Sequence, residues 1–308
     1  MKVNYIFLAG MEKSGTSALA GWLTSQGLAR HMVSGRKESH QYVHTDFPPT
    51  PLAAGDCPWL DASVSYSVSP HAVNRLPEHG AKIALCLRNP LERTWSAYRM
   101  KKIIALQSDE ASTTIRRYND AAQIDLKSEN SLNSKLYEDE KSHFIRIFPR
   151  SISKKIEQNF DDEIERLRSG TFIDRINYEM EFLMSRRSFP FMSILISSFC
   201  YYGIRPFLDR YQPEDMVIVS LGKLRDKINR EKFTCRLTGK MVETDDIKFG
   251  FSTSDLNFNE PDPIFTENKF DSLRSALSYD QQQFRQLLEG RGVATDLVDW
   301  DDLQRYLA

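Results

Sequence analysis

The sequence predicts an α/β fold, a P-loop-like three-layer sandwich whose central parallel sheet is flanked by helices and which carries a helical insert. Apolar stretches of strand length alternate with helical patterns over residues 3–100. Such alternation is typical of parallel strands joined by right-handed helical crossovers. The region at about 105–190 breaks the pattern, because it is largely polar and charged.

The first element is a buried strand followed by a loop that suits a phosphate. Val3–Ala9 is apolar, aromatic and β-branched, as expected of a parallel strand, and a helical pattern begins at Ala18. The loop between them, Gly10–Ser17, reads Gly-Met-Glu-Lys-Ser-Gly-Thr-Ser. Backbone N–H groups at a helix start, the helix dipole and a lysine together attract anions. The candidate phosphate-binding residues are Lys13, Ser14, Gly15, Thr16 and Ser17.

The loop departs from the NTPase P-loop in the place of its lysine. That motif needs Gly-Lys-Ser/Thr in consecutive order, so that the lysine reaches the β- and γ-phosphates. Here Thr16 follows Gly15 directly, and the lysine stands earlier, at Lys13. A lysine at the lip of the loop lies beside the bond attached to the bound phosphate, which suits a partner for a leaving group. Taken alone, the loop also fits an ordinary strand–turn–helix corner.

A second strand and helix supply another candidate anion site. Lys82–Leu87 reads as a buried strand, and Pro90 suits the first turn of the helix that follows. Arg88 then lies at the carboxyl end of the strand, where open α/β sheets bind ligands. Ser96 falls about two turns into the helix, so that it and Arg88 can reach one anion. Arg93 is expected to brace the neighbouring glutamate or the sheet edge. The alternative is a helix N-terminus that carries surface charge.

Together, the two motifs resemble the sulfotransferases that use 3′-phosphoadenosine-5′-phosphosulfate (PAPS). In that family a Lys-x-Gly-Thr loop, here Lys13–Thr16, grips the 5′-phosphosulfate. A second motif, Arg-x-Pro-x-x-Arg-x-x-Ser-x-Tyr, grips the 3′-phosphate, and its fixed positions are all present in Arg88–Tyr98. The resemblance implies that PAPS is the sulfuryl donor and that Lys13 stabilises the leaving oxygen. It also implies that Arg88 and Ser96 hold the 3′-phosphate.

Two further segments resemble the heparan-sulfate-type branch of that family and its bacterial relatives. Lys37–Tyr42 resembles the branch's Lys-Glu-x-His-x-Phe segment, whose glutamate is the catalytic base. Asp61–Tyr66 resembles its Glu-Lys-Ser-Pro-Ser-Tyr segment. The resemblance implies in-line transfer of the sulfuryl group to a hydroxyl or an amine, with Glu38 as the base. His40 is a second candidate base or a substrate contact, and an ordinary loop histidine is the alternative.

The chain departs from the branch in ways that bear on the acceptor. Ala62 stands where the glycan enzymes usually carry a lysine that faces the substrate, and their C-terminal disulfide loop has no clear counterpart. The resemblance therefore extends to the nucleotide more fully than to a glycosaminoglycan acceptor. A small-molecule or sugar acceptor is expected, and the loss of the lysine favours a small one over a long polyanionic glycan.

The expected organisation is one sulfotransferase domain over residues 1–308, with a core at 1–104 and 191–308 and a helical insert at about 105–190. The insert is interpreted as a cap over the acceptor site, and a solvated decoration is the alternative.

Three apolar segments are predicted outside the two motifs. The spacing of apolar residues from Ile152 to Leu167 predicts an amphipathic helix. The stretch Phe189–Ile204 is predicted to be a core helix or a packing surface for the substrate. Met216–Val219 is predicted to be a core strand that returns to the sheet.

Composition sets limits on partners and compartment. The formal net charge is −1, so no overall attraction to nucleic acid or to an acidic membrane is expected. The four cysteines lack paired or metal-type spacing and the six histidines form no cluster, which favours reduced thiols, a cytoplasmic protein and no metal. Neither a signal peptide nor a membrane span is predicted. The resemblance favours a bacterial enzyme, and the oligomeric state is left open.

Two other functions are left open by the sequence. A P-loop kinase of a small metabolite would share the sheet and the cradle, and it would need an acidic Mg²⁺ ligand at a strand end, for which Asp61 is the candidate. A non-catalytic nucleotide-binding protein would keep the cradle without a working base. Magnesium-dependent ATP binding would support the kinase, and a silent substitution of Glu38 would support the non-catalytic protein.

Overall fold

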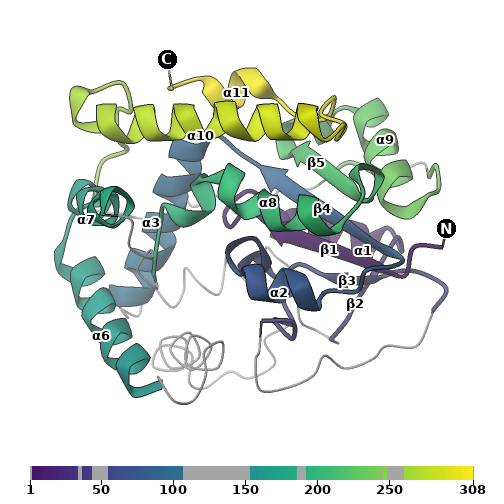
Figure 1. Cartoon of the computed structure of the whole chain (residues 1–308), viewed down its shortest axis with the longest axis horizontal. Helices are drawn as coiled ribbons and strands as arrows, with labels where there is room; N and C mark the ends of the chain where they lie inside the picture. The colour runs from purple at the N-terminus through teal and green to yellow at the C-terminus, as the bar shows by residue number, and fades with distance from the viewer. Residues whose placement is uncertain are drawn as a thin grey trace.

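The computed structural model describes residues 2–33, 37–43, 55–106, 153–185, 192–242, 245–247 and 260–307. The strands in these ranges form one sheet of five, in the order β2-β3-β1-β4-β5, and every pairing is parallel. They are β1 (Tyr5–Gly10), β2 (Arg30–His31), β3 (Trp59–Asp61), β4 (Ala81–Leu87) and β5 (Met216–Ser220). The predicted fold class, a parallel sheet between helices, is confirmed (Figure 1).

Helices cover both faces of the sheet. One face packs against α1 (Thr16–Ser25) and α9 (Lys227–Thr238). The other packs against α2 (Pro70–Arg75), α8 (Cys200–Arg210) and the C-terminal half of α10 (Asp271–Gly290). Figure 1 shows α8 crossing in front of the sheet and α10 running along the top of the molecule.

The remaining elements are one short helix near the C-terminus and several 3₁₀ turns between the longer elements. The last helix is α11 (Trp300–Gln304). The 3₁₀ turns are η1 (Val64–Val68), η3 (Ile196–Ser198), η4 (Pro213–Asp215), η5 (Leu221–Arg225) and η7 (Asn268–Phe270). No described helix has both the length and the apolar character needed to cross a membrane.

The two faces of the sheet follow from the alternation of side chains along each strand. In β1, Ile6 and Leu8 belong to the hydrophobic cluster on the α1 side, whereas Phe7 and Ala9 belong to the cluster on the α8 side. Successive residues of a strand point to opposite faces, so a strand that is apolar at every position is buried on both. This is why the apolar runs predicted β1, β4 and β5 within one or two residues of their observed ends.

A third hydrophobic cluster joins the helical insert to the core. It combines α3 (Pro90–Leu106), α6 (Ser153–Ser169), α7 (Phe172–Met184) and the N-terminal half of α10, and Figure 1 shows α3, α6 and α7 gathered to the left of the sheet. The amphipathic helix predicted at Ile152–Leu167 is confirmed as α6, whose buried side chains enter this cluster. Residues 107–152 and 186–190 of the predicted insert lie outside the described residues.

The apolar stretch predicted as a core helix at Phe189–Ile204 becomes a regular helix only where α8 begins, at Cys200. Residues 189–191 lie outside the described residues, and 192–199, which are buried except for Ile196, contain just the 3₁₀ turn η3. The reason is Glu179 of α7, whose carboxylate accepts the N–H groups of Ile194 (2.8 Å) and Leu195 (2.9 Å). A side chain from a distant element thus satisfies donors that a helix would otherwise have paired.

A buried carboxylate supports the start of α8. Asp280 of α10 is 4% exposed and its Oδ2 accepts the N–H of Tyr201 at 3.3 Å. Its Oδ1 has no hydrogen-bond partner within the described residues. Burial raises the pKa of Asp280 to about 7, although the N–H groups of Tyr201 and Cys200 oppose the shift. Between the ordinary aspartate pKa and about pH 7, the folded protein therefore holds a proton on Asp280 that the unfolded chain has already released.

We predict that Asp280→Asn removes a pH dependence of stability. The pKa of Asp280 is higher in the folded state, so the free energy of unfolding should fall as the pH rises from the ordinary aspartate range to about 7. The variant should be more stable than the wild type by about 2 kcal/mol at about pH 8, and no more stable at about pH 5. Urea denaturation at both pH values measures this. Asp301→Asn, at an exposed position, is the control. Its free energy of unfolding should depend on pH in the same way as that of the wild type.

Candidate active site

The predicted site residues gather at one edge of the sheet. Lys13–Ser17 follow β1, Glu38 and His40 lie beyond β2, Asp61 closes β3, and Arg88 follows β4. Because all the strands are parallel, their carboxyl ends share an edge, and this is where open α/β sheets bind ligands. The structure therefore brings together candidates that the sequence places on four different strands.

The loop after β1 has the features of an anion cradle. Helix α1 begins at Thr16 without a side-chain cap, so the N–H groups of its first turn point into the loop. Ser14 is 2% exposed, and its Oγ has no hydrogen-bond partner within the described part of the chain. Lys13 and Gly15 both have positive φ, 63° and 88°. Uncapped helix donors and an orphaned buried hydroxyl fit a phosphate group, which would satisfy both.

The glycine of this loop is required by its surroundings as well as by its conformation. A Cβ built on Gly15 would lie 2.1 Å from Cδ2 of Leu221. Leu221 begins η5, directly after β5, so the fifth strand end also contributes to the cradle. Sequence reasoning did not find Leu221, because an apolar side chain after a core strand gives no signal of its contact.

Arg93 braces the loop and is buried beneath it. It is 1% exposed, and its Nε donates to Oγ of Ser198 at 2.6 Å. One terminal nitrogen donates to the carbonyl of Glu12 in the loop at 3.3 Å, and the other donates to the carbonyl of Ile194. Lys101 completes the anchor with an ion pair to Oε2 of Glu12 at 3.2 Å.

The sequence predicts that Arg93 braces Glu92 or the sheet edge; within the described residues it contacts not Glu92 but the loop that follows β1. Glu92 pairs instead with Arg88, at 3.5 Å, and with Arg305, at 2.6 Å. Arg93 is drawn inward because its planar guanidinium can satisfy three acceptors at once in the interior. Its role is to hold the loop, and its burial keeps it away from any ligand at the surface.

The two residues predicted to hold one phosphate differ in exposure. The Arg88 side chain is 42% exposed at the end of β4 and contacts Glu92. Ser96 lies in α3 and is buried. Within the described residues no hydrogen bond joins Arg88 to Ser96, and the two residues lie on adjoining elements, the end of β4 and helix α3.

Glu38 is held between the side chains of Lys37 and His40. Its Oε1 pairs with Nζ of Lys37, and its Oε2 lies 3.1 Å from Nε2 of His40. Burial alone would raise the pKa of Glu38, but Lys37 and His40 outweigh it and hold that pKa well below its usual value. The other ring nitrogen of His40, Nδ1, lies 2.9 Å from Oγ of Ser65. A carboxylate held in this way is a weak base until one of its partners moves.

Asp61 is the centre of a polar cluster. It is fully buried, and both of its carboxylate oxygens accept hydrogen bonds. The donors are Ser39, Ser63 and Tyr66. Both oxygens of Asp61 are already engaged by donors, an arrangement that does not favour it as the Mg²⁺ ligand that the kinase alternative would need. Within the described residues no group of three His, Cys, Asp or Glu side chains is arranged to hold a metal.

The position at which the glycan enzymes carry a lysine points inward here. Ala62 is fully buried in the hydrophobic cluster on the α1 side. Its N–H donates to the carbonyl of Lys37 at 3.0 Å. The lysine that lies beside this position is therefore Lys37, whose side chain pairs with Glu38.

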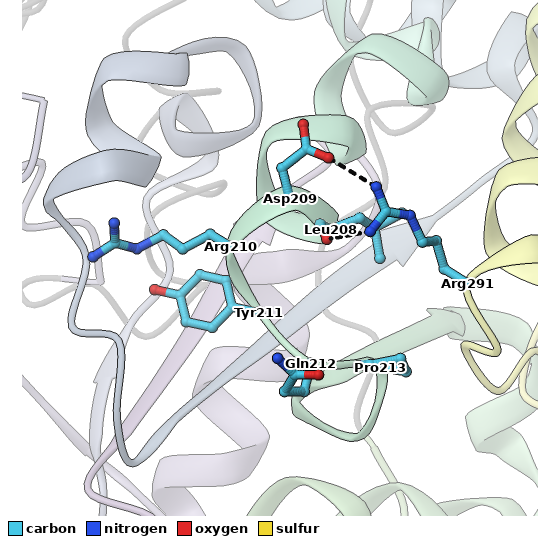
Figure 2. Close-up of a pocket in the computed structure, with 7 residues that line it drawn as sticks. All are labelled: Leu208, Asp209, Arg210, Tyr211, Gln212, Pro213 and Arg291. Carbon is cyan, nitrogen blue, oxygen red and sulfur yellow. Dashed lines mark hydrogen bonds and ion pairs between the residues drawn. The ribbon is translucent and has the colours of Figure 1, made fainter.

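A small cavity lies at the amino ends of the strands, the end of the sheet opposite to the candidate site, and is not part of this site. It has a volume of about 140 Å³ at the C-terminal end of α8, where the chain enters β5 through Pro213 (Figure 2). Arg291 spans it, pairing with Asp209 at 3.0 Å and donating to the carbonyl of Leu208 at 3.4 Å. The strands run from this end toward the candidate site, so the cavity lies at their amino ends.

Comparison with known proteins supports the fold. No protein-family model matches the chain, and no curated protein does. Among solved structures, the crystal structure of a sulfotransferase from Alicyclobacillus acidocaldarius is similar, with a TM-score of 0.51 and 18% identity. The match covers 94% of this chain and 97% of that chain. The chain therefore has a sulfotransferase-like fold.

We predict that Arg93→Lys destabilises the protein by about 2–4 kcal/mol, because a lysine cannot reach all three acceptors and leaves buried carbonyls unpaired. Urea denaturation gives the change in the free energy of unfolding. Arg88→Lys, the same substitution at an exposed position of the same motif, should change stability by less than about 0.5 kcal/mol. Equal effects of the two variants would contradict the bracing role of Arg93.

Proposed function

We propose that this protein is a PAPS-dependent sulfotransferase that moves a sulfuryl group to a hydroxyl or amine of a small-molecule or sugar acceptor. The observation that carries the proposal is the cradle after β1, where the uncapped start of α1 meets the buried hydroxyl of Ser14, which has no partner in the described part of the chain. The sulfotransferase-like fold and the motif from Arg88 to Tyr98, which follows the adjoining strand, give it further support.

The nucleotide would span two neighbouring strand ends. In the proposal Ser14, Gly15, Thr16 and Ser17 hold the 5′-phosphosulfate through helix N–H groups and hydroxyls. Arg88 and Ser96 hold the 3′-phosphate. The ion pair of Arg88 with Glu92 is long, at 3.5 Å, and half-exposed, so exchanging it for a forked pair with a phosphate costs little.

The chemistry proposed is an in-line displacement at sulfur. The acceptor oxygen or nitrogen forms a bond to sulfur as the bond from sulfur to the nucleotide oxygen breaks, and Lys13 stabilises the charge that grows on that oxygen. Glu38 takes the acceptor proton, with His40 as its hydrogen-bonded partner. An acceptor that displaces Lys37 from Glu38 removes the main cause of its low pKa, and so makes the carboxylate a stronger base when it is needed.

The packing supports treating the chain as one sulfotransferase domain. Helix α3, which carries Ser96, shares its hydrophobic cluster with α6 and α7 of the insert. Helix α10 contributes to that cluster through its N-terminal half and to the sheet through its C-terminal half. An insert anchored in this way is suited to border the acceptor, which is the role we propose for it.

The proposal predicts which nucleotide binds. By calorimetry, adenosine 3′,5′-bisphosphate should bind tightly, whereas 5′-AMP and ATP with Mg²⁺ should bind weakly or not at all. Arg88→Ala should lower the affinity for the bisphosphate by about 10–100-fold, because a charge-assisted bond to the 3′-phosphate is lost. Arg305→Ala is the matched control, since Arg305 is an exposed arginine that also pairs with Glu92. The affinity of this variant for the bisphosphate should equal that of the wild type.

Other outcomes would assign the protein differently. If ATP with Mg²⁺ binds and the bisphosphate does not, the assignment as a sulfotransferase is wrong and the protein is assigned as a kinase. Binding of the bisphosphate that Arg88→Ala leaves unchanged would contradict the proposed place of the 3′-phosphate.

A further inference from the structure

Asp61 accepts five hydrogen bonds at the end of β3. Its Oδ1 accepts the N–H of Ser39 (3.2 Å), the N–H of Ser63 (3.1 Å) and the hydroxyl of Ser63 (2.5 Å). Its Oδ2 accepts the hydroxyls of Ser39 (2.5 Å) and Tyr66 (2.6 Å). Every partner is a donor, so the carboxylate of Asp61 acts as an acceptor throughout.

This sets the direction of the hydrogen bonds made by the two serines. Each hydroxyl has one proton, and because that proton goes to Asp61, the lone pairs face the opposite way. Oγ of Ser63 accepts the N–H of His40 at 3.0 Å, and Oγ of Ser39 accepts the N–H of Gln41 at 3.3 Å. The backbone at His40 and at the next residue is thus held by serines whose orientation depends on Asp61.

His40 is the residue that most needs this support. Its φ is 51°, a left-handed conformation that costs a non-glycine residue about 1–3 kcal/mol. Its ring is engaged at both nitrogens, with Ser65 at 2.9 Å and with Glu38 at 3.1 Å. The strained backbone aims the ring between these two partners, and it persists because the surrounding bonds fix it.

We propose that Asp61 is a positioning residue: by orienting Ser39 and Ser63 it holds His40 against Glu38 for proton transfer, without itself touching the acceptor. The inference rests on the proposed function for the chemistry that the pair performs. Asparagine is the informative substitution, because it keeps the shape of the side chain and replaces one acceptor oxygen by an NH₂ donor. Two donors would then face each other, and at least one serine would have to turn away from the His40 segment.

The test is NMR of histidine-labelled protein, with His40→Gln used to assign the ring signals. In Asp61→Asn, the main-chain N–H of His40 should exchange with solvent at least about tenfold faster, and its ring signals should shift or broaden. The signals of the exposed His71 and His79 should stay in place, whereas those of His31 are expected to shift because the charge of Asp61 acts on its pKa. Affinity for adenosine 3′,5′-bisphosphate should stay within about twofold of the wild type, because the cradle after β1 is not altered.

Two further variants make the test specific. Ser63→Ala removes the hydroxyl that links Asp61 to His40, and it should release His40 in the same way, including in the case that Asp61→Asn does not fold. Tyr66→Phe removes a donor to Asp61 and leaves both serines in place, so it should leave His40 protected.

The outcomes separate this proposal from the function on which it rests. Unchanged His40 signals in both Asp61→Asn and Ser63→Ala would overturn the positioning role, and so would equal release of His40 in Tyr66→Phe. Failure of the wild type to bind the bisphosphate would instead refute the proposed function, and the result at His40 would stand.

Discussion

The parallel pairing of β1 with β3 and β4 is the constraint on which the rest of the site depends. β1 lies at the centre of the sheet, and the N–H of Met11, just beyond it, donates to the carbonyl of Cys86 at 2.8 Å. Because the three strands run in one direction, the loops that follow them must emerge side by side. Without this pairing, Lys13, Asp61 and Arg88 would not lie at the same end of the sheet.

Two buried charged residues turn that shared edge into a fixed arrangement. Arg93 ties the cradle after β1 to the segment before α8, and Asp61 ties the Glu38–His40 segment to η1. Both are saturated by hydrogen bonds in the interior, which is the condition under which a buried charge is tolerated. The groups assigned to chemistry, Glu38, His40 and Arg88, are more exposed. Support and reactivity are thus divided between buried and exposed side chains.

The sequence was most informative where a signal is local. The apolar runs located β1 and β4, Pro90 marked the start of α3, and apolar spacing located α6. The contacts of Arg93 were not predictable, because its acceptors in Glu12 and Ser198 come from segments up to 105 residues away. The same limit applied to the residues before α8, whose backbone is satisfied by a carboxylate from α7.

Asp61 shows that a location at the end of a strand does not by itself define the role of a residue. Its place at the end of a strand made it a candidate metal ligand, whereas Ser39, Ser63 and Tyr66 occupy both of its oxygens. Ser63 lies two residues after Asp61 whereas Ser39 lies 22 residues before it, and nothing in the sequence says which way their hydroxyls point. That direction is decided only when β2 and β3 bring the two segments together.

The most direct measurement of the central claim is a crystal structure of the protein with adenosine 3′,5′-bisphosphate. We expect the 5′-phosphate in the cradle of Ser14–Ser17, at the N-terminus of α1, and the 3′-phosphate beside Arg88 at the end of β4. A bisphosphate bound away from the carboxyl edge of the sheet, or with its 3′-phosphate remote from Arg88, would contradict that claim.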